Sequence, residues 1–516
     1  MTWTSTRGIE LPDLVPAALR RSWVEQGHCP DRDTYALFAD HERAHPDRPA
    51  VIDEAGTVGY AELGRHARRI AGTLHATGLG PRDIIAVQLP NGRHALAAEL
   101  AVAALGAVAL PIPTDRGHRD TLGLLRRSGA GAVIVTASAQ VDPPCPAIPV
   151  ESAVDAHEYA PVPVAAESPA RILVSSGTET EPKMVAYSHN AMAGGRGNYL
   201  RALYAGSEPP RSLVLVPLAS SYGSLGIVTL ARIGGTLVLP DRFEPSAALR
   251  AIEIHRPSHL FGVPTMLRRM LSSGDAADVS SLRTVVSSGM PLDPVSRHDC
   301  RQRFGCPVVN VYGSADGVNC HTAREGSGLG RPDPAVAALW VAEHGEICAL
   351  GPMTPLCYVN APELDARYRT PEGGTRTGDR GHFDSDGNLH LVDRLKQIVI
   401  RGGHNISIAE VERHLLAHRS IADATCVPVP DADLGERLCA CVVPAPGTPP
   451  VGLPELTRHL EADRGLDRRK LPEFLLVLSE LPLGPTGKVC RTSLTRLAAG
   501  LVRSGAPETT PETTGR

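Results

Sequence analysis

The pattern of apolar and polar positions divides the chain into regions with different predicted structure. In the first region, 35–154, segments of helical spacing at 60–78 and 94–105 alternate with short apolar runs at 84–89 and 107–111. Strands that alternate with helices of this length predict βαβ units in a parallel sheet.

The same alternation returns over 171–311. Its apolar runs fall at 213–217, 236–239, 259–263 and 284–287. Each run has the length of a buried strand and is followed by a more polar segment, so these four runs predict further parallel strands.

The pattern changes after about residue 332, where helical spacing disappears. Segments 339–350 and 388–392 predict antiparallel hairpins, with turns at His344-Gly345 and Asp386-Gly387. Beyond Arg394 a compact mixed segment begins.

In that mixed segment, Ser407 and Glu410 form a capping box that opens a helix to about His418, and 438–443 predicts a strand. Residues 504–516 carry two Pro-Glu-Thr-Thr copies and predict a disordered tail.

We therefore expect an α/β protein of more than one domain, because 516 residues exceed the size of a single core. A large body, 1–393, with parallel-rich sheets and a small β-barrel-like region precedes a joint at 393–396. A small α+β domain, 394–503, follows, and the tail at 504–516 ends the chain.

Composition and charge exclude several classes of protein. The net charge is −4, the aromatic content is 4 %, and no basic run occurs, so nucleic acid is not expected as a partner. No apolar N-terminal run and no stretch of membrane-spanning length is present, which predicts a cytoplasmic protein without a membrane partner. Eleven cysteines without a C-x-x-C pair predict buried thiols rather than disulfides or a zinc site.

Lysine is unusually rare in this chain. Of 52 lysines and arginines only four are lysines, which leaves 48 arginines. A lysine ammonium is a compact point charge, whereas an arginine guanidinium is a broad fork, so lysine suits a place beside a phosphate or a reacting carboxylate. Chance retention is the alternative interpretation. The four positions are Lys183, Lys396, Lys470 and Lys488.

The strongest local signal is segment 172–183, where an apolar strand leads into a loop of hydroxyls and one glycine that ends on Lys183. Backbone N–H groups and hydroxyls of such a loop can surround phosphate oxygens while the ammonium neutralises their charge. The loop is not a Walker A motif, because Pro182 precedes the lysine and Met184 follows it. Phosphate binding and an ordinary polar turn both remain open from this segment alone.

This loop resembles the signature loop of the AMP-forming acyl/aryl-CoA ligase superfamily, which includes luciferase and the adenylation domains of peptide synthetases. Further motifs follow in the family's order, and the resemblance extends from about residue 35 to residue 497. They are Asn310-Val311-Tyr312-Gly313-Ser314-Ala315-Asp316 (N-x-Y-G-x-T-E), Tyr358-Val359-Asn360-Ala361-Pro362-Glu363 (G-Y-x-N-x-P-E without its glycine), Arg376-Thr377-Gly378-Asp379 (T-G-D), Asp393-Arg394-Leu395-Lys396 (G-R-x-K without its glycine), 402–412 (G-G-E-N-I and E-x-E) and 482–491 (P-x-T-x-x-G-K-x-x-R). The ordered set is far more specific than any single motif.

The resemblance implies a ligase that activates a carboxylic acid in two steps. ATP and the acid give an acyl-adenylate and pyrophosphate with Mg²⁺ as cofactor, and the thiol of coenzyme A then displaces AMP. The residues that would hold the β- and γ-phosphates are Ser175, Ser176, Gly177, Thr178 and Lys183. Those that would bind the nucleoside are Ser288, Gly289, Met290, Asn310, Tyr312, Gly313, Ser314 and Asp379.

The same resemblance implies roles for the remaining charged residues. Arg394 would assist at the ribose and phosphate, and Asp316 stands where the family places its Mg²⁺-binding glutamate. Lys488 would bridge the attacking carboxylate and the α-phosphate and so offset charge in the transition state.

The small C-terminal domain would rotate about the hinge residue Lys396 between the two half-reactions. This rotation would bring Gly402 and Gly403 to the pantetheine arm, where side chains would obstruct a narrow channel. A simple hairpin turn is the alternative interpretation of these glycines.

The resemblance also implies an acyl pocket lined by 217–223, 286–290 and 312–317. The first stretch lacks the aspartate with which amino-acid-adenylating domains hold an α-ammonium group. Apart from Asp316, which the resemblance assigns to Mg²⁺, these stretches contain no charged residue, so we expect a neutral aliphatic, alicyclic or aromatic acid. The arginine-rich composition favours a role in secondary metabolism. The pocket residues are Ser220, Ser221, Tyr222 and Gly223.

The sequence departs from the family pattern at a few positions. Glu179, Thr180 and Met184 replace a hydroxyl and two glycines of the loop, Ala315 removes a threonine hydroxyl, and Asp316 is one methylene shorter than glutamate. If the Glu179 carboxylate lay about 5 Å from a bound phosphate, their repulsion would cost roughly 3 kcal/mol per phosphate charge at an effective dielectric near 20.

These departures leave three alternatives open beside the CoA ligase. The acyl group could pass to the phosphopantetheine of a carrier protein acting in trans, or the protein could thioesterify an adenylate made elsewhere. A pseudoenzyme that serves as a binding subunit is the alternative outside catalysis.

Overall fold

The computed structural model describes most of the chain. For residues 175, 393, 394, 398, 400, 404, 405 and 502–504 only the backbone is described. The described ranges are 2–139, 143–175, 182–205, 209–289, 292, 294–319, 329–394, 398–401, 404–431, 434–484 and 488–504.

The described residues form two compact units. The first comprises Met1–Trp340, Cys348–Thr377 and Phe383–His390, and the second comprises Val341–Ile347, Gly378–His382 and Leu391–Arg516. Among the described residues, none of the helices combines the length and the apolar character that crossing a membrane requires.

One seven-stranded sheet of the first unit is built from the predicted run of parallel strands. Its order is β15-β14-β13-β11-β12-β3-β4, and all neighbours are parallel except β3 and β4. The strands are β3 (Pro49–Asp53), β4 (Gly56–Gly59), β11 (Arg211–Val214), β12 (Thr236–Val238), β13 (His259–Gly262), β14 (Thr284–Ser288) and β15 (Val308–Val311).

A second seven-stranded sheet has the order β20-β10-β9-β6-β5-β7-β8. Its strands β9 and β10 form an antiparallel pair in which Ser175 lies opposite Lys183, so segment 176–182 connects two paired strands. The strands are β5 (Ile84–Val87), β6 (Val108–Pro111), β7 (Ala132–Val135), β8 (Ala147–Pro149), β9 (Pro169–Ser175), β10 (Lys183–Ser188) and β20 (Cys357–Tyr358).

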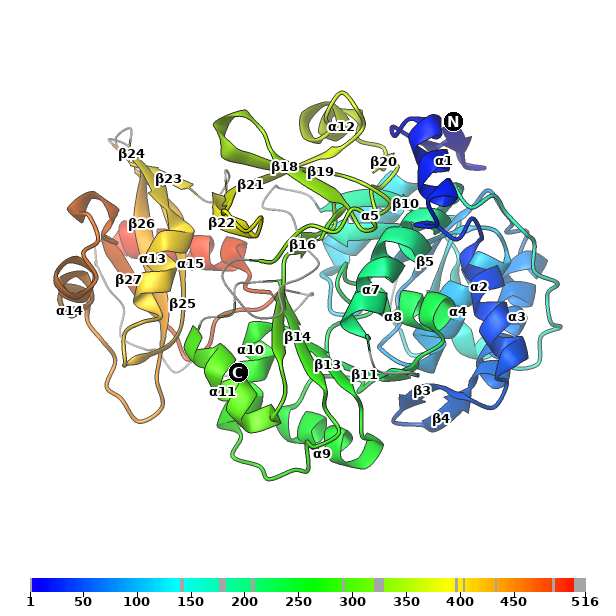
Figure 1. Ribbon diagram of the computed structural model, residues 1–516, viewed down its shortest axis with the longest axis horizontal. Helices are drawn as coiled ribbons and strands as arrows, with labels where there is room; N and C mark the ends of the chain where they lie inside the picture. The colour runs from blue at the N-terminus through cyan, green and yellow to red at the C-terminus, as the bar shows by residue number, and fades with distance from the viewer. Residues whose placement is uncertain are drawn as a thin grey trace. The chain divides into compact units, whose positions relative to one another are not determined.

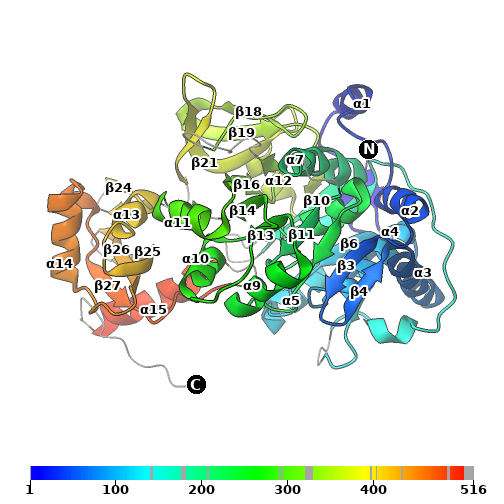
Figure 2. The same ribbon diagram turned by 60° about the horizontal axis from the view of Figure 1, so that its bottom comes forward.

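Helices α2 (Thr34–Ala44), α3 (Tyr60–Ala76) and α4 (Arg93–Ala104) pack against one another, and both views show them together beside the sheets (Figures 1 and 2). Helix α4 is buried on nearly all sides because its residues are small and apolar. The predicted helices at 60–78 and 94–105 are confirmed, as are the predicted strands, with β11 lying two to three residues earlier than its apolar run. The α/β fold class with parallel-rich sheets is confirmed as well.

The region after residue 332 differs in one respect from the prediction that helices vanish there. Strands β18 (Ala338–Val341), β19 (Glu346–Leu350), β21 (Thr375–Phe383) and β22 (Leu389–Arg394) form the expected small sheet. A helix, α12 (Pro362–Tyr368), interrupts it. Proline at its first turn has a helical φ, and Glu363 and Asp365 favour the positive end of the helix dipole, so this short helix had a local signal that the hairpin pattern concealed.

The second unit contains a five-stranded sheet that is buried on both faces. Strands β23 (Ile398–Arg401), β24 (His404–Ser407), β25 (Ile421–Asp431), β26 (Gly435–Pro444) and β27 (Phe474–Val477) form this sheet. Along β26, Leu438, Ala440 and Val442 face one hydrophobic core, whereas Cys439 and Cys441 face another. This alternation explains the continuous apolar run that predicted the strand.

Helices cover the two faces of this sheet. Helix α13 (Ile408–Leu415) packs on β25 and begins at the predicted Ser407 cap, whose Oγ accepts a hydrogen bond from Glu410 N, but it ends before the expected His418. Helix α15 (Arg491–Ser504) contacts β25 as well. The described cysteines are free thiols, and most are buried, as predicted.

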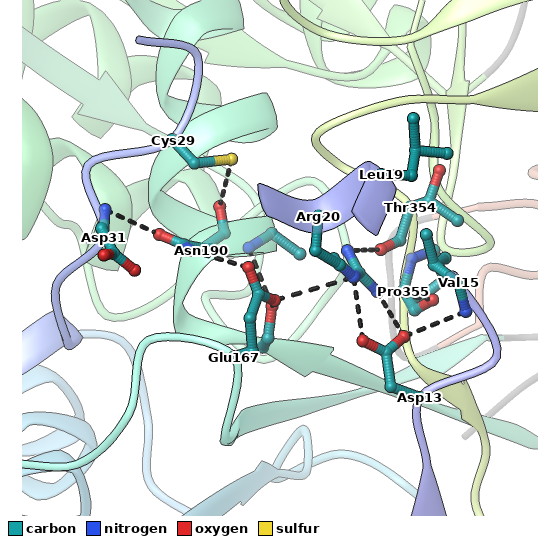
Figure 3. Close-up of polar contacts among 12 residues, drawn as sticks. Asp13, Val15, Leu19, Arg20, Cys29, Asp31, Glu167, Asn190, Thr354 and Pro355 are labelled. Atoms are coloured by element: carbon teal, nitrogen blue, oxygen red, sulfur yellow. Dashed lines mark hydrogen bonds and ion pairs between the residues drawn. The ribbon is translucent and has the colours of Figure 1, made fainter. Parts of the chain in front are cut away.

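An N-terminal segment, 2–33, is joined to the rest of the first unit through one buried arginine. Strands β1 (Thr2–Thr4) and β2 (Glu10–Pro12) form a hairpin, and helix α1 (Ala17–Glu25) carries Arg20, which is 3 % exposed. Figure 3 shows Arg20 between the carboxylate of Asp13 and the carbonyls of Thr354 and Pro355. The guanidinium therefore joins the N-terminal segment to the strand that leads to Tyr358.

We expect Arg20→Met to lower the free energy of unfolding by about 3 kcal/mol, because it leaves the Asp13 carboxylate without its buried partner. Urea unfolding followed by circular dichroism measures this change. The matched control is Arg32→Met, which removes an exposed pair with Asp40 and should cost about 1 kcal/mol or less. Equal losses in the two variants would contradict a stabilising role for the buried contacts of Arg20.

Candidate active site

Several of the predicted nucleoside-binding residues lie at or after the carboxyl ends of two parallel strands, β14 and β15. Ser287 pairs with Asn310 and Ser288 with Val311, and the Ser288 hydroxyl donates a hydrogen bond to the Val311 carbonyl at 3.2 Å. Asn310 and Tyr312 are buried. Gly289 follows β14 with φ +95°, a left-handed conformation that glycine adopts without strain. Ligands of open α/β sheets bind outside such strand ends.

The next segment, 313–319, presents Asp316 in a tight turn between β16 (Gly313–Ser314) and β17 (Val318–Asn319). Three hydrogen bonds fix this aspartate. Its N–H donates to Ser314 Oγ at 3.1 Å, its carbonyl accepts from Thr375 Oγ1 at 2.6 Å, and its Oδ1 accepts from the Tyr358 hydroxyl at 2.7 Å. The half-buried carboxylate is thus held in one position.

The chemistry around Asp316 fits Mg²⁺. That ion binds hard oxygen ligands and takes one or two carboxylates together with substrate phosphates, rather than a complete cage of protein ligands. Among the described residues, no group of three His, Cys, Asp or Glu side chains could hold a metal on its own. A single ordered carboxylate is therefore the kind of ligand set expected for a magnesium–nucleotide complex.

Tyr358 connects Asp316 with Lys183. The Nζ of Lys183 lies 3.6 Å from the ring centroid of Tyr368 and 5.7 Å from that of Tyr358, so both rings face the ammonium. Burial, followed by the charge of Asp316, raises the pKa of Tyr358, which keeps its hydroxyl a donor at neutral pH. Tyr358 and Tyr368 were not among the predicted site residues, although Tyr358 belongs to a quoted motif.

The predicted acyl-pocket turn, 217–223, is held by side chains from distant elements. Asn91 Oδ1 accepts from Leu218 N at 2.8 Å, and Arg171 on β9 donates to the Leu218 carbonyl at 2.8 Å. The turn also closes tightly on itself, because a Cβ at Gly223 would lie 1.9 Å from the Pro217 carbonyl oxygen. Only glycine fits at this position.

Tyr222 extends from the turn toward β14. Its hydroxyl donates to the Val286 carbonyl at 2.9 Å, and its ring lies 6.0 Å from that of Phe261. Burial, followed by the neighbouring phenols of Tyr199 and Tyr204, raises the pKa of Tyr222 well above its usual value. The hydroxyl therefore stays protonated and joins two of the three stretches predicted to line the pocket.

Arg196 is a residue of this region that the sequence analysis missed. It ends a π-helical turn, Met192–Arg196, and is 2 % exposed. Its guanidinium donates to the Ser221 carbonyl, Ser221 Oγ and Ser224 Oγ at 3.0–3.2 Å.

Tyr187 extends this contact to the turn that carries Asp316. Arg196 stacks on the Tyr187 ring at 4.9 Å, and the Tyr187 hydroxyl donates to the Ala315 carbonyl at 2.7 Å. Burial raises the pKa of Tyr187. Arg196 and Tyr187 therefore connect the turn 217–223 to Ala315, the residue that precedes Asp316. The sequence does contain a signal for Arg196, because it is the one charged residue in a run, 191–197, of otherwise small and apolar residues.

The predicted site residues of the second unit lie on separate elements. Asp379 on β21 is 1 % exposed, next to Gly378, whose N–H donates to Glu346 Oε1 at 3.1 Å. Lys488 is exposed, and its carbonyl accepts from Gly484 N at 2.6 Å, which closes the turn that carries it. Lys470 pairs with Glu410 at 2.7 Å.

Several predicted residues lie outside the described part of the chain, and their roles stay predictions. For Ser175 and Arg394 the structure gives only the backbone position, at the ends of β9 and β22. The residues outside the description are Ser176, Gly177, Thr178, Met290, Lys396, Gly402 and Gly403. Ser220 and Ser314, by contrast, lie in the two turns described above.

The departures from the family pattern are partly explained by the structure. Met184, which replaces a glycine, is 2 % exposed and lies in the hydrophobic core of the β9–β10 sheet. It therefore packs within the protein. Ala315 is buried, and its backbone serves as the acceptor for Tyr187.

The fold and this arrangement of residues define an adenylate-forming enzyme. The chain belongs to the AMP-binding enzyme family, whose model matches residues 38–359, and the model of the AMP-binding enzyme C-terminal domain matches residues 410–488. The resemblance that the motifs indicated is confirmed.

Individual relatives act on different acids and acceptors. A 2-hydroxy-7-methoxy-5-methyl-1-naphthoate–CoA ligase from Streptomyces carzinostaticus is 29 % identical, over 95 % of this chain and 96 % of the relative. A salicyl-AMP ligase / salicyl-S-ArCP synthetase from Mycobacterium tuberculosis is 30 % identical, over 93 % of each chain. The structure of o-succinylbenzoate CoA synthetase from Bacillus subtilis with ATP and magnesium has a TM-score of 0.78 and 26 % identity, over 89 % of this chain and 98 % of that one.

We expect Gly223→Ala to destabilise the protein by about 1–3 kcal/mol, because the added Cβ meets backbone atoms of Pro217 and Leu218 that cannot move independently. Urea unfolding measures the change. The matched control is Gly80→Ala, where a Cβ meets nothing within 4 Å and the effect should stay within about 1 kcal/mol. A neutral Gly223→Ala would show that the turn can relax.

Proposed function

We propose that this protein activates a carboxylic acid with ATP and then transfers the acyl group to coenzyme A. The observation that carries the proposal is the grouping of the Asp316 carboxylate, the Tyr358 hydroxyl and the Lys183 ammonium. This grouping offers a metal ligand and a phosphate-binding cation on either side of one buried tyrosine. The family membership and the CoA ligases among the relatives support it.

In the first step an oxygen of the acid attacks the α-phosphorus of ATP, and the bond to pyrophosphate breaks. Thr178, Lys183 and the loop hydroxyls would hold the β- and γ-phosphates. Asn310, Tyr312 and Ser288 would surround the adenine at the strand ends, and Asp379 would accept the ribose hydroxyls, with Arg394 nearby. Bound Mg²⁺ would offset the phosphate charge, and Asp316 would be its protein ligand.

In the second step the thiolate of coenzyme A attacks the acyl carbon, and AMP leaves. We propose that Lys488 serves the first step, where its compact charge suits both the carboxylate and the α-phosphate, and that Gly402 and Gly403 serve the second. A rotation of the C-terminal domain about Lys396 would exchange the two. Such an exchange requires Lys488 to lie on the surface of its own domain, and Lys488 is exposed.

A carrier protein is the second candidate for the acyl acceptor. One relative that matches nearly the whole chain is named a salicyl-S-ArCP synthetase, so the same arrangement of domains also occurs with a carrier. The chemistry of the first step is identical in the two cases.

ATP–pyrophosphate exchange over a panel of acids tests the proposal. Exchange with at least one acid, followed by an acyl-CoA product when CoA is added, is the expected result. Exchange without a CoA product, but with acylation of an added phosphopantetheinyl carrier, would favour the second candidate. A CoA product obtained only from supplied acyl-adenylate would mean that the protein performs the thiol step alone.

We expect Lys488→Ala to reduce ATP–pyrophosphate exchange by about a hundredfold to a thousandfold, the range measured when a group that stabilises transition-state charge is removed. The same variant should still form acyl-CoA from a supplied acyl-adenylate. Lys470→Ala is the control, because it removes a lysine that pairs with Glu410 and should leave exchange within about threefold. Equal loss of both half-reactions in Lys488→Ala would contradict the assignment.

We expect Tyr358→Phe to reduce exchange about tenfold and to raise the Mg²⁺ concentration needed for half-maximal rate, because a hydrogen bond to a carboxylate contributes about 1.5 kcal/mol or more. Asp316→Ala should lose exchange at any Mg²⁺ concentration. Magnesium titrations of the exchange rate measure both effects. An unchanged magnesium requirement in both variants would remove Asp316 from the metal site.

A further inference from the structure

Arg196 differs from every other buried arginine that the structure describes. Arg20, Arg116, Arg171 and Arg196 are the described arginines classed as buried. The first three each have a carboxylate within 4 Å, from Asp13 at 2.9 Å, Asp120 at 3.8 Å and Glu99 at 3.3 Å. Among the described residues, no carboxylate lies within that distance of Arg196.

The contacts of Arg196 are all with neutral groups. Its guanidinium donates to two serine hydroxyls, the Ser221 carbonyl and the Tyr187 hydroxyl, and its Nε has no partner among the described residues. A guanidinium stays charged in proteins, and a buried charge is costly unless an opposite charge or further hydrogen bonds compensate it. Hydrogen bonds and the Tyr187 ring compensate part of this charge, and among the described residues no opposite charge completes the compensation.

Arg196 acts through Ser221, which is half-buried whereas the guanidinium is almost fully buried. Ser221 Oγ accepts a hydrogen bond from Arg196 at 3.2 Å, and its own proton has no acceptor among the described residues. A hydroxyl that already accepts from a cation is a stronger donor. The pair therefore presents a polarised donor at the turn 217–223.

We infer that the acid substrate carries, besides its reacting carboxylate, a second oxygen or nitrogen acceptor that lies against the Arg196–Ser221 pair. The inference rests on the proposed function and on the acyl pocket that the family resemblance implies at this turn. It narrows the substrate class to hydroxy-, oxo- or aza-aromatic acids and dicarboxylic acids. A plain hydrocarbon acid would leave the polarised Ser221 hydroxyl without an acceptor.

The test compares acids that differ only in the second acceptor. ATP–pyrophosphate exchange is measured with benzoate, the three hydroxybenzoates, picolinate and the phthalate isomers, and with hexanoate against adipate. We expect at least one acceptor-bearing acid to exceed its parent by about tenfold or more in kcat/KM, a ratio that corresponds to 1.4 kcal/mol. Arg196→Met should reduce that preference to within about threefold, with the KM for ATP unchanged.

Two further variants separate recognition from folding. Arg196→Lys keeps the charge and should retain part of the preference. Arg211→Met is the matched control. Arg211 lies at the start of β11, away from the turn 217–223, and its guanidinium donates to the His255 carbonyl, so its replacement should leave the preference intact. If Arg196→Met fails to fold, the wild-type preference and the Arg196→Lys values decide the question.

Three results would overturn the inference. They are a wild-type enzyme without preference for any acceptor, an unchanged preference in Arg196→Met, or an equal loss for all acids, which would mean that Arg196 holds the reacting carboxylate. These outcomes all require exchange with some acid. Absence of exchange with every acid, although ATP binds, would instead contradict the proposed function.

Discussion

The position of Asp316 depends on hydroxyl groups that reach its turn from three other elements. Thr375 holds its carbonyl, Tyr358 holds its carboxylate, and Tyr187 holds the carbonyl of the preceding Ala315. A turn of seven residues cannot fix a carboxylate by itself, because its own backbone satisfies few of its polar groups. The surrounding phenols are buried and stay protonated, so they act as donors over the whole physiological pH range.

The same network reaches the acyl turn through Arg196. Arg196 contacts Ser221 and Tyr187, and Tyr187 in turn contacts Ala315. The turn 217–223, proposed for the acid, and the turn 313–319, proposed for the metal, are therefore linked through these two side chains. Gly195, directly before Arg196, lies so close to Met353 that a Cβ there would stand 2.3 Å from its backbone nitrogen. The π-helical turn is therefore pressed against the segment that leads to Tyr358, and its geometry is tightly constrained.

Much of the fold could be predicted because buried parallel strands are continuous apolar runs, as at 259–263 and 284–287. Asn310 and Tyr312 were assigned through the family resemblance, and the structure places Asn310 among the last residues of β15 and Tyr312 directly after it. Arg196 and Tyr187 could not be predicted in the same way, since they meet Ser221 and Ala315 only in the folded chain, at separations of 25 and 128 residues. Helix α12 was missed because seven residues leave little periodicity, and its local signals were confined to the first turn, with Pro362, Glu363 and Asp365.

The cysteines of the second unit acquire a particular meaning if the acyl acceptor is a thiol. Cys426, Cys439 and Cys441 have no exposed surface, and burial raises the pKa of Cys426 well above its usual value. Thiol–disulfide exchange needs both a thiolate and access to the sulfur. Oxidised coenzyme A could therefore form mixed disulfides with these three residues only after the sheet opens, whereas the partly buried Cys490 of the same unit is more accessible.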